Sequence, residues 1–144
     1  ELSYVPQNIY LFDTTIHNNI IFNSAIKMSD KTNDHQLKNV LKISNSDIFV
    51  NKLKKKHNFM VGERGSKLSG GQIQRIGIAR ALYNNPKIII FDESTNSLDN
   101  KTEKTVLQNL KKYAKNNNIT ILFITHNKAV LNYCDRIFNL DEKK

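Results

Sequence analysis

Two short apolar runs with one amphipathic segment between them most constrain the fold of this chain. Residues 87–91 and 120–125 are rich in β-branched side chains and lack polar alternation, which is typical of parallel strands buried on both faces. Between them, Asn100 and Glu103 resemble a capping box, and an apolar helical stripe follows until residues 116–118. This order of strand, crossover helix and strand predicts an α/β fold with a parallel sheet.

The segments around this unit are predicted to be mainly helical. Residues 3–6 form a short extended segment, because the residue before a proline favours β geometry. We therefore expect one partial domain over residues 1–144, with a helical subdomain at about 8–85 and an α/β core at about 86–144. The other expected elements are helices near 15–21, from Asp34, from Ser46 or Asp47, at 72–82 and at 128–133, a polar loop at 23–33, and a last strand at 136–140.

Composition narrows the class of protein. A chain of 144 residues can bury one ordinary core, and no apolar run approaches the roughly 20 residues that cross a bilayer. The single cysteine, Cys134, cannot form an internal disulfide. A net charge of +9 would suit nucleic acid, but the lysines are mixed with abundant asparagines along the chain and lack interleaved aromatic residues. Nucleic acid is therefore the less favoured partner.

Two adjacent carboxylates follow the first apolar run. Asp92 and Glu93 would lie at the carboxyl end of a strand, which is the sheet edge where parallel α/β proteins bind ligands. Asp92 can hold Mg²⁺, directly or through water, and Glu93 can polarise an attacking water. A metal and a positioned carboxylate supply most of what phosphoryl transfer requires. The alternative is a strand that simply ends in polar residues, and this pair alone does not decide between the two.

A Ser-Gly-Gly sequence precedes the helix predicted at 72–82, which begins with Gln72. Glycines let the backbone approach a phosphate, and the first N–H groups of a helix favour an anion. An ordinary capped loop would explain Ser-Gly-Gly alone, but Gln74, Arg75 and the downstream carboxylates favour a phosphate site. The candidate phosphate-binding residues are Ser69, Gly70, Gly71 and Gln72.

Two further polar residues follow predicted strands. His126 comes directly after 120–125, at the same sheet edge as Glu93 if the strands are parallel, and can donate to a terminal phosphate. Gln7 follows the extended segment, and its amide oxygen can complete a Mg²⁺ shell or contact the attacking water. Considered alone, either residue would more often be an ordinary solvated polar residue than a functional one. The remaining histidines, His17, His35 and His57, show no ligand spacing and are predicted to be surface residues.

In this order, the motifs resemble the later part of the nucleotide-binding domain of an ATP-binding-cassette (ABC) transporter. Two further segments are similar to exporter-type cassettes: residues 61–65 resemble the X-loop, and residues 11–16 the segment after the Q-loop. The five general motifs cover nearly the whole chain. They are the Q-loop (4–7), the signature motif (68–72), Walker B with its catalytic carboxylate (88–93), the D-loop (96–99) and the H-loop (125–126).

The resemblance implies part of a P-loop NTPase-like parallel sheet core with an attached α-helical subdomain. Its implied cofactors are ATP and Mg²⁺. Its implied partners are a transmembrane domain and a second nucleotide-binding domain in a head-to-tail dimer, at the cytoplasmic face of the cell membrane. In that dimer the signature residues would bind the γ-phosphate held by the opposite subunit. The implied roles are catalysis for Glu93 and His126, Mg²⁺ binding for Asp92 and Gln7, and nucleotide binding for Gln7, Ser69, Gly70, Gly71, Gln72 and Asp99.

The main departure from the family pattern is at the front of the chain. No Gly-x-x-x-x-Gly-Lys-Ser/Thr loop is present, and residues 65–67 do not supply one. We therefore expect a fragment of a longer exporter that binds ATP poorly alone. The expected function is ATP hydrolysis that powers export or the flipping of a lipid or lipid-linked molecule. The alternatives are a soluble ABC-type ATPase acting on nucleic acid and a truncated partner that offers its signature motif without turnover.

Overall fold

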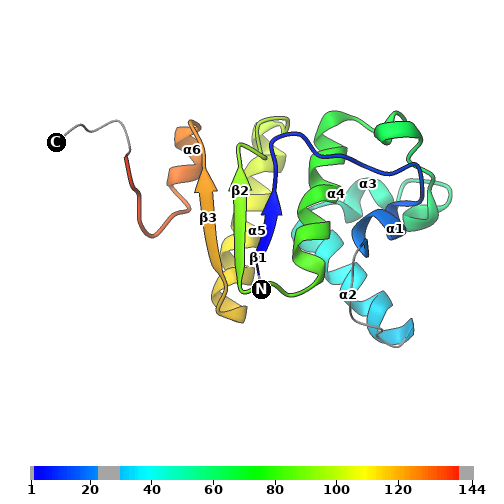
Figure 1. The fold of residues 1–144 in the computed structure, drawn as a ribbon, viewed down its shortest axis with the longest axis horizontal. Helices are drawn as coiled ribbons and strands as arrows, with labels where there is room; N and C mark the ends of the chain where they lie inside the picture. The colour runs from blue at the N-terminus through cyan, green and yellow to red at the C-terminus, as the bar shows by residue number, and fades with distance from the viewer. Residues whose placement is uncertain (1, 23–29, 140–144) are drawn as a thin grey trace.

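A parallel sheet of three strands organises the molecule. The computed structural model describes residues 2–22 and 30–139, with β1 (Leu2–Val5), β2 (Ile88–Asp92) and β3 (Thr120–Ile124) in the order β1-β2-β3. Both pairings are parallel, and the register places Val5 opposite Phe91 and Phe91 opposite Phe123. All three carboxyl ends therefore meet at one sheet edge (Figure 1). The predicted α/β fold with a parallel sheet is confirmed.

The crossover from β2 to β3 is α5 (Asn100–Asn117), which lies behind the sheet in Figure 1. Its residues Val106 and Leu110 are fully buried. The predicted Asn100–Glu103 capping box is wrong, because Asp99 is the N-cap and accepts a hydrogen bond from the Thr102 amide at 3.0 Å. Glu103 then stands one position beyond the third helical residue that a capping box uses, and its side chain has a tertiary partner instead.

The helical part packs around α4 (Gly70–Tyr83), which contacts β1, α1 and α2. Its fully buried residues include Ile76, Ile78 and Leu82. The predicted polar loop at 23–33 is wrong over residues 30–33, which begin α2, and residues 23–29 lie outside the described part. The remaining elements of this part are α1 (Ile16–Ile20), α2 (Asp30–Ile43), α3 (Asp47–Val50) and the 3₁₀ turns η1 (Lys56–Asn58) and η2 (Glu63–Gly65).

Only one face of the sheet is covered by the described residues. Along β2, Ile89 is fully buried while Ile88 is 41% exposed, and on β3 Leu122 and Ile124 are 48% and 50% exposed. The expectation of strands buried on both faces is therefore wrong for this part of the chain. Side chains alternate between the two faces of a strand, so this pattern means that helices pack against one face alone.

The C-terminal region is less regular than predicted. Helix α6 (Lys128–Leu131) ends two residues before the predicted end, and residues 136–139 form no strand. Phe138 is 80% exposed, so the apolar character of this segment does not reflect burial among the described residues. Leu140 lies outside the described part. No helix within residues 2–22 and 30–139 is long and apolar enough to cross a membrane.

Candidate active site

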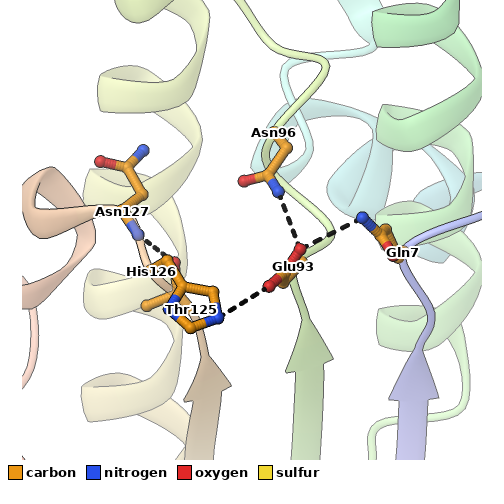
Figure 2. Close-up of polar contacts among 6 residues, drawn as sticks. All are labelled: Gln7, Glu93, Asn96, Thr125, His126 and Asn127. Atoms are coloured by element: carbon orange, nitrogen blue, oxygen red, sulfur yellow. Dashed lines mark hydrogen bonds and ion pairs between the residues drawn. The ribbon is translucent and has the colours of Figure 1, made fainter.

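The carboxyl ends of the three strands converge on the side chain of Glu93. The Gln7 amide Nε2 donates to Glu93 Oε2 at 3.1 Å, and His126 Nε2 lies 3.4 Å from Glu93 Oε1. Figure 2 shows the carboxylate between these two side chains. Each residue follows a different strand, so adjacent parallel pairing is what brings positions 7, 93 and 126 together. The structure thus places these three predicted site residues in one network.

The backbone at Glu93 explains where its carboxylate lies. Its N–H donates to the Ile124 carbonyl at 2.9 Å, which extends the β2–β3 ladder by one residue. Its φ of +46° is left-handed, a conformation that costs a residue other than glycine on the order of 1 kcal/mol. This turn ends the strand and leaves the side chain at the edge, 26% exposed. Backbone strain at a residue that ends a strand beside a candidate site indicates a functional constraint on that residue.

Asn96 donates a second hydrogen bond to the Glu93 carboxylate. Its Nδ2 donates to Glu93 Oε2 at 3.3 Å from the loop that follows β2 (Figure 2). Sequence reasoning placed Asn96 in the segment that resembles the D-loop (96–99) and missed this contact. The feature of the sequence that could have indicated this contact is the polar side chain of Asn96, three residues after Glu93 and between Ser94 and Asn100.

Asp92 has a partner that the sequence analysis also missed. The Tyr4 hydroxyl donates to Asp92 Oδ2 at 2.6 Å. This hydrogen bond, with some burial and the nearby negative charge, raises the pKa of Tyr4 above its ordinary value. Tyr4 pairs with Ile90 in the β1–β2 register, and Asp92 lies two residues further on the same face. The pairing depends on the strand register, which the sequence alone did not supply.

The oxygen donors at this edge fit Mg²⁺. Asp92 retains a second carboxylate oxygen, and Gln7 uses its Nε2 toward Glu93, so its amide oxygen remains an acceptor. Mg²⁺ prefers oxygen ligands and usually takes one or two from protein, with phosphate and water supplying the rest. In the described ranges no cluster of three or more His, Cys, Asp or Glu forms a complete metal cage. Such a sparse donor set suits a metal shared with a phosphate ligand.

The signature residues form a separate, local arrangement at the start of α4. Ser69 Oγ accepts from the Gln72 amide at 3.3 Å, and Gln72 Oε1 accepts from the Ser69 amide at 2.9 Å, which completes a capping box. Ser69 and Gly70 are exposed. Within the described part, no hydrogen bond joins Ser69, Gly70, Gly71 or Gln72 to Glu93, Gln7 or His126. The structure therefore places the predicted phosphate-binding residues at a second location.

One loop residue, Ser97, connects the two locations. Its backbone N–H donates to Oε1 of Gln74, a residue of α4 that is 4% exposed, at 3.1 Å. A Cβ added to Gly71 would lie 3.0 Å from the Ser97 carbonyl oxygen, so only glycine allows this approach without displacement. Asp99, two residues later, caps α5, and hydrogen bonds from Thr102 lower the pKa of its carboxyl. In this structure Asp99 acts as a helix cap.

Arg80 fixes the segment that follows Gln7. Its guanidinium donates to the Asn19 carbonyl at 2.7 Å, to Asn19 Oδ1 at 2.9 Å and to the Tyr10 carbonyl at 2.9 Å. Burial lowers the pKa of this arginine below its ordinary value. Since three acceptors satisfy this half-buried cation, the segment between Gln7 and α1 is held against α4. No pattern in the sequence indicated this anchor.

The other histidines lie outside this site. His17 and His57, predicted to be surface residues, are half-buried, and their ring centroids lie 5.8 Å apart. Burial, followed by the charge of His17, lowers the pKa of His57. His35 is exposed, as predicted.

Comparisons with known proteins identify the family of this chain. Residues 1–96 match the family described as ABC transporter. An ATP-dependent lipid A-core flippase of Francisella tularensis subsp. holarctica is 41% identical over 140 residues, which are 97% of this chain and 22% of that protein. A Rickettsia typhi protein, named as an export ATP-binding/permease protein, is 39% identical over 143 residues, or 99% of this chain and 24% of that protein.

A solved structure shows the same fold. The structure of a bacterial Atm1-family ABC exporter with ATP bound has a TM-score of 0.79 and 35% sequence identity, and covers 90% of this chain and 22% of the exporter chain. This chain therefore belongs to the ABC transporter family, as its motifs predict. It spans about a fifth of the length of the curated relatives it matches.

Proposed function

We propose that this chain is the part of an ABC exporter that completes ATP hydrolysis, and that the hydrolysis powers export or the flipping of a lipid or lipid-linked molecule. The observation that carries this proposal is the Glu93 carboxylate, held between Gln7 and His126 at the ends of three adjacent parallel strands. The relatives named as a lipid A-core flippase and an export permease support the exporter type.

In this proposal Glu93 orients the attacking water and accepts its proton. Its hydrogen bonds from Gln7 and Asn96 fix both the position and the rotation of the carboxylate. A positioned base of this kind typically contributes 10²- to 10⁴-fold to a rate. The His126 side chain is 93% exposed and lies beside the carboxylate, so its imidazole is free to contact the terminal phosphate.

Asp92 and the Gln7 amide oxygen would hold Mg²⁺ next to the phosphates. When bound, the ion neutralises charge that develops on the phosphate oxygens. The Tyr4 hydroxyl orients the Asp92 carboxylate through its 2.6 Å hydrogen bond. The chain's own contribution is therefore a fixed pair of oxygen donors beside a fixed base.

The signature residues would act on a second nucleotide-binding domain. Ser69 and Gly70 are exposed at the N-terminus of α4, a helix of 14 residues whose dipole favours an anion. Their separation from Glu93 supports a γ-phosphate contact in trans, with Ser69, Gly70, Gly71 and Gln72 facing the nucleotide of the partner domain. Asp99 would support that interface from the D-loop. A transmembrane domain at the cytoplasmic face of the membrane completes the proposed assembly.

The test is Glu93→Gln in the full-length protein. We expect ATP binding to persist while turnover falls by about 10²-fold or more, since the amide cannot accept the proton. Asp135→Asn is the matched control, because it makes the same chemical change at a side chain that is 94% exposed and outside the network. Turnover measured by phosphate release and binding measured with labelled ATP separate the two steps. Wild-type turnover in Glu93→Gln would remove Glu93 from the catalytic role.

A further inference from the structure

A buried carboxylate that the proposed mechanism does not use lies behind the site. Glu103, in the first turns of α5, is 6% exposed, and both of its oxygens accept from Asn127 Nδ2, at 2.9 and 3.1 Å. No lysine or arginine of the described residues forms an ion pair with it. Burial of a carboxylate costs free energy unless the group is hydrogen-bonded. The Asn127 amide is therefore the group that stabilises the buried Glu103 carboxylate.

Asn127 uses its other polar groups on the local backbone. Its Oδ1 accepts from the Ala129 amide at 2.9 Å and so caps α6, and its own N–H donates to Thr125 Oγ1 at 2.9 Å (Figure 2). These contacts lie on both sides of His126 in the chain. With the side-chain amide anchored on α5, the backbone on either side of that histidine is fixed.

This anchoring matters because little else holds His126. Its side chain is 93% exposed, and its polar contact is the 3.4 Å approach to Glu93. A side chain so exposed takes its position from its backbone, and displacement of a reacting group by about 1 Å can cost 10²-fold in rate.

We propose that Glu103 and Asn127 form a positioning pair that sets His126 against Glu93 and ties the first turns of the crossover helix to the H-loop. The pair deepens the proposed ATP hydrolysis and depends on it. Neither residue touches the nucleotide in this scheme. Glu103 acts through Asn127, and Asn127 acts through the backbone of residues 125–127. The proposal therefore predicts a loss in kcat with little change in KM for ATP.

The two residues allow an exchange of donor and acceptor as a test. Asn127→Asp replaces the donor with a second carboxylate facing Glu103, while an aspartate can still cap α6. We expect kcat for ATP hydrolysis by the full-length protein to fall roughly 10- to 100-fold, with KM changed less than about twofold. The double variant Glu103→Gln with Asn127→Asp restores one amide facing one carboxylate. We expect it to recover most of the wild-type kcat.

The control is Asn51→Asp, which makes the same change at an exposed residue after α3. If Asn127→Asp does not fold, Asn127→Ser keeps an α6 cap and removes the amide donor, and the same loss in kcat is expected. A wild-type kcat in Asn127→Asp or Asn127→Ser overturns the pair. A folded double variant without recovery also overturns it. If the wild-type protein itself hydrolyses no ATP, the proposed function fails instead, which distinguishes the two outcomes.

Discussion

The sheet edge and the tip of α4 both carry predicted site residues, but they are built differently. At the sheet edge, Gln7 and Glu93 are 86 positions apart in the chain and meet through strand pairing. At the helix tip, Ser69 and Gln72 are 3 positions apart and bond to each other. The first arrangement exists only when the sheet is complete, whereas the second forms as soon as the helix forms. Chemistry that needs exact alignment is therefore expected at the edge, and recognition of a partner's phosphate at the tip.

The largest effect in this comparison is expected from His126→Ala. Removal of a group that contacts the terminal phosphate should lower turnover by about 10²-fold. Because the side chain is 93% exposed, the melting temperature should stay at its wild-type value. His35→Ala is the matched control at an exposed histidine outside the site. A parallel loss of stability and turnover in His126→Ala would show that the residue supports the fold instead.

The next largest effect tests whether the tip of α4 contacts the phosphate held by the partner nucleotide-binding domain. Ser69→Arg places a long cation where the partner's phosphate would lie, so closure of the two nucleotide-binding domains should fail and turnover should fall at least about tenfold. Fluorescent labels on the two domains of the full-length protein report ATP-dependent approach. Ser66→Arg, three residues earlier and also exposed, is the control. Normal closure in Ser69→Arg would reject the role in trans.

A smaller effect distinguishes the role of Ser69 as a helix cap from its proposed contact with phosphate. Ser69→Ala removes the oxygen that accepts from the Gln72 amide, and loss of such a cap typically costs about 1 kcal/mol. Hydrogen exchange of the first turn of α4 should therefore accelerate about fivefold. Ser66→Ala is the control, and exchange at the sheet edge should not change. Unchanged exchange at the start of α4 would mean that the cap adds no local stability.

The smallest effect concerns the pH dependence of the Tyr4–Asp92 hydrogen bond. The pKa of Tyr4 is raised in the folded state, so its contribution to stability is present below the ordinary pKa of about 10 and is lost as the pH rises through the raised value. Tyr4→Phe should remove this alkaline loss and one step of phenolate absorbance above a pH of about 10. Tyr10→Phe is the control, since Tyr10 is exposed and outside the network. Loss of a phenolate step at the ordinary pKa of about 10, instead of above it, would contradict the hydrogen bond.

Much of the fold followed from local patterns. The apolar runs that contain Ile89 and Ile121, with one helical stripe between them, were sufficient to predict parallel strands and a crossover helix. Asp92 and Glu93 were placed at the correct edge because they end such a run. Residues 30–33 and 136–139 were predicted wrongly, since polar composition does not exclude a helix and apolar composition does not establish a strand.

The contacts that complete the site were not predictable in the same way. Tyr4 and Asn96 reach the carboxylates only through the strand register and the left-handed turn at Glu93. Asn127 was unremarked because nothing in its sequence neighbourhood identifies Glu103, 24 residues away, as its partner. A hydrogen bond between distant residues depends on angles and offsets that periodicity does not encode.

The sequence by itself determined the family, the order of the motifs, the helix that follows Ser69 and the strand that ends in an acid. These features depend on residue types at short spacing, which local geometry and helix capping translate directly into structure. Only the tertiary structure decided that Glu93 lies between Gln7 and His126, and that Glu103 anchors the residue after that histidine. Such contacts require three strands and a crossover helix to be packed in one register, because each partner comes from a different element.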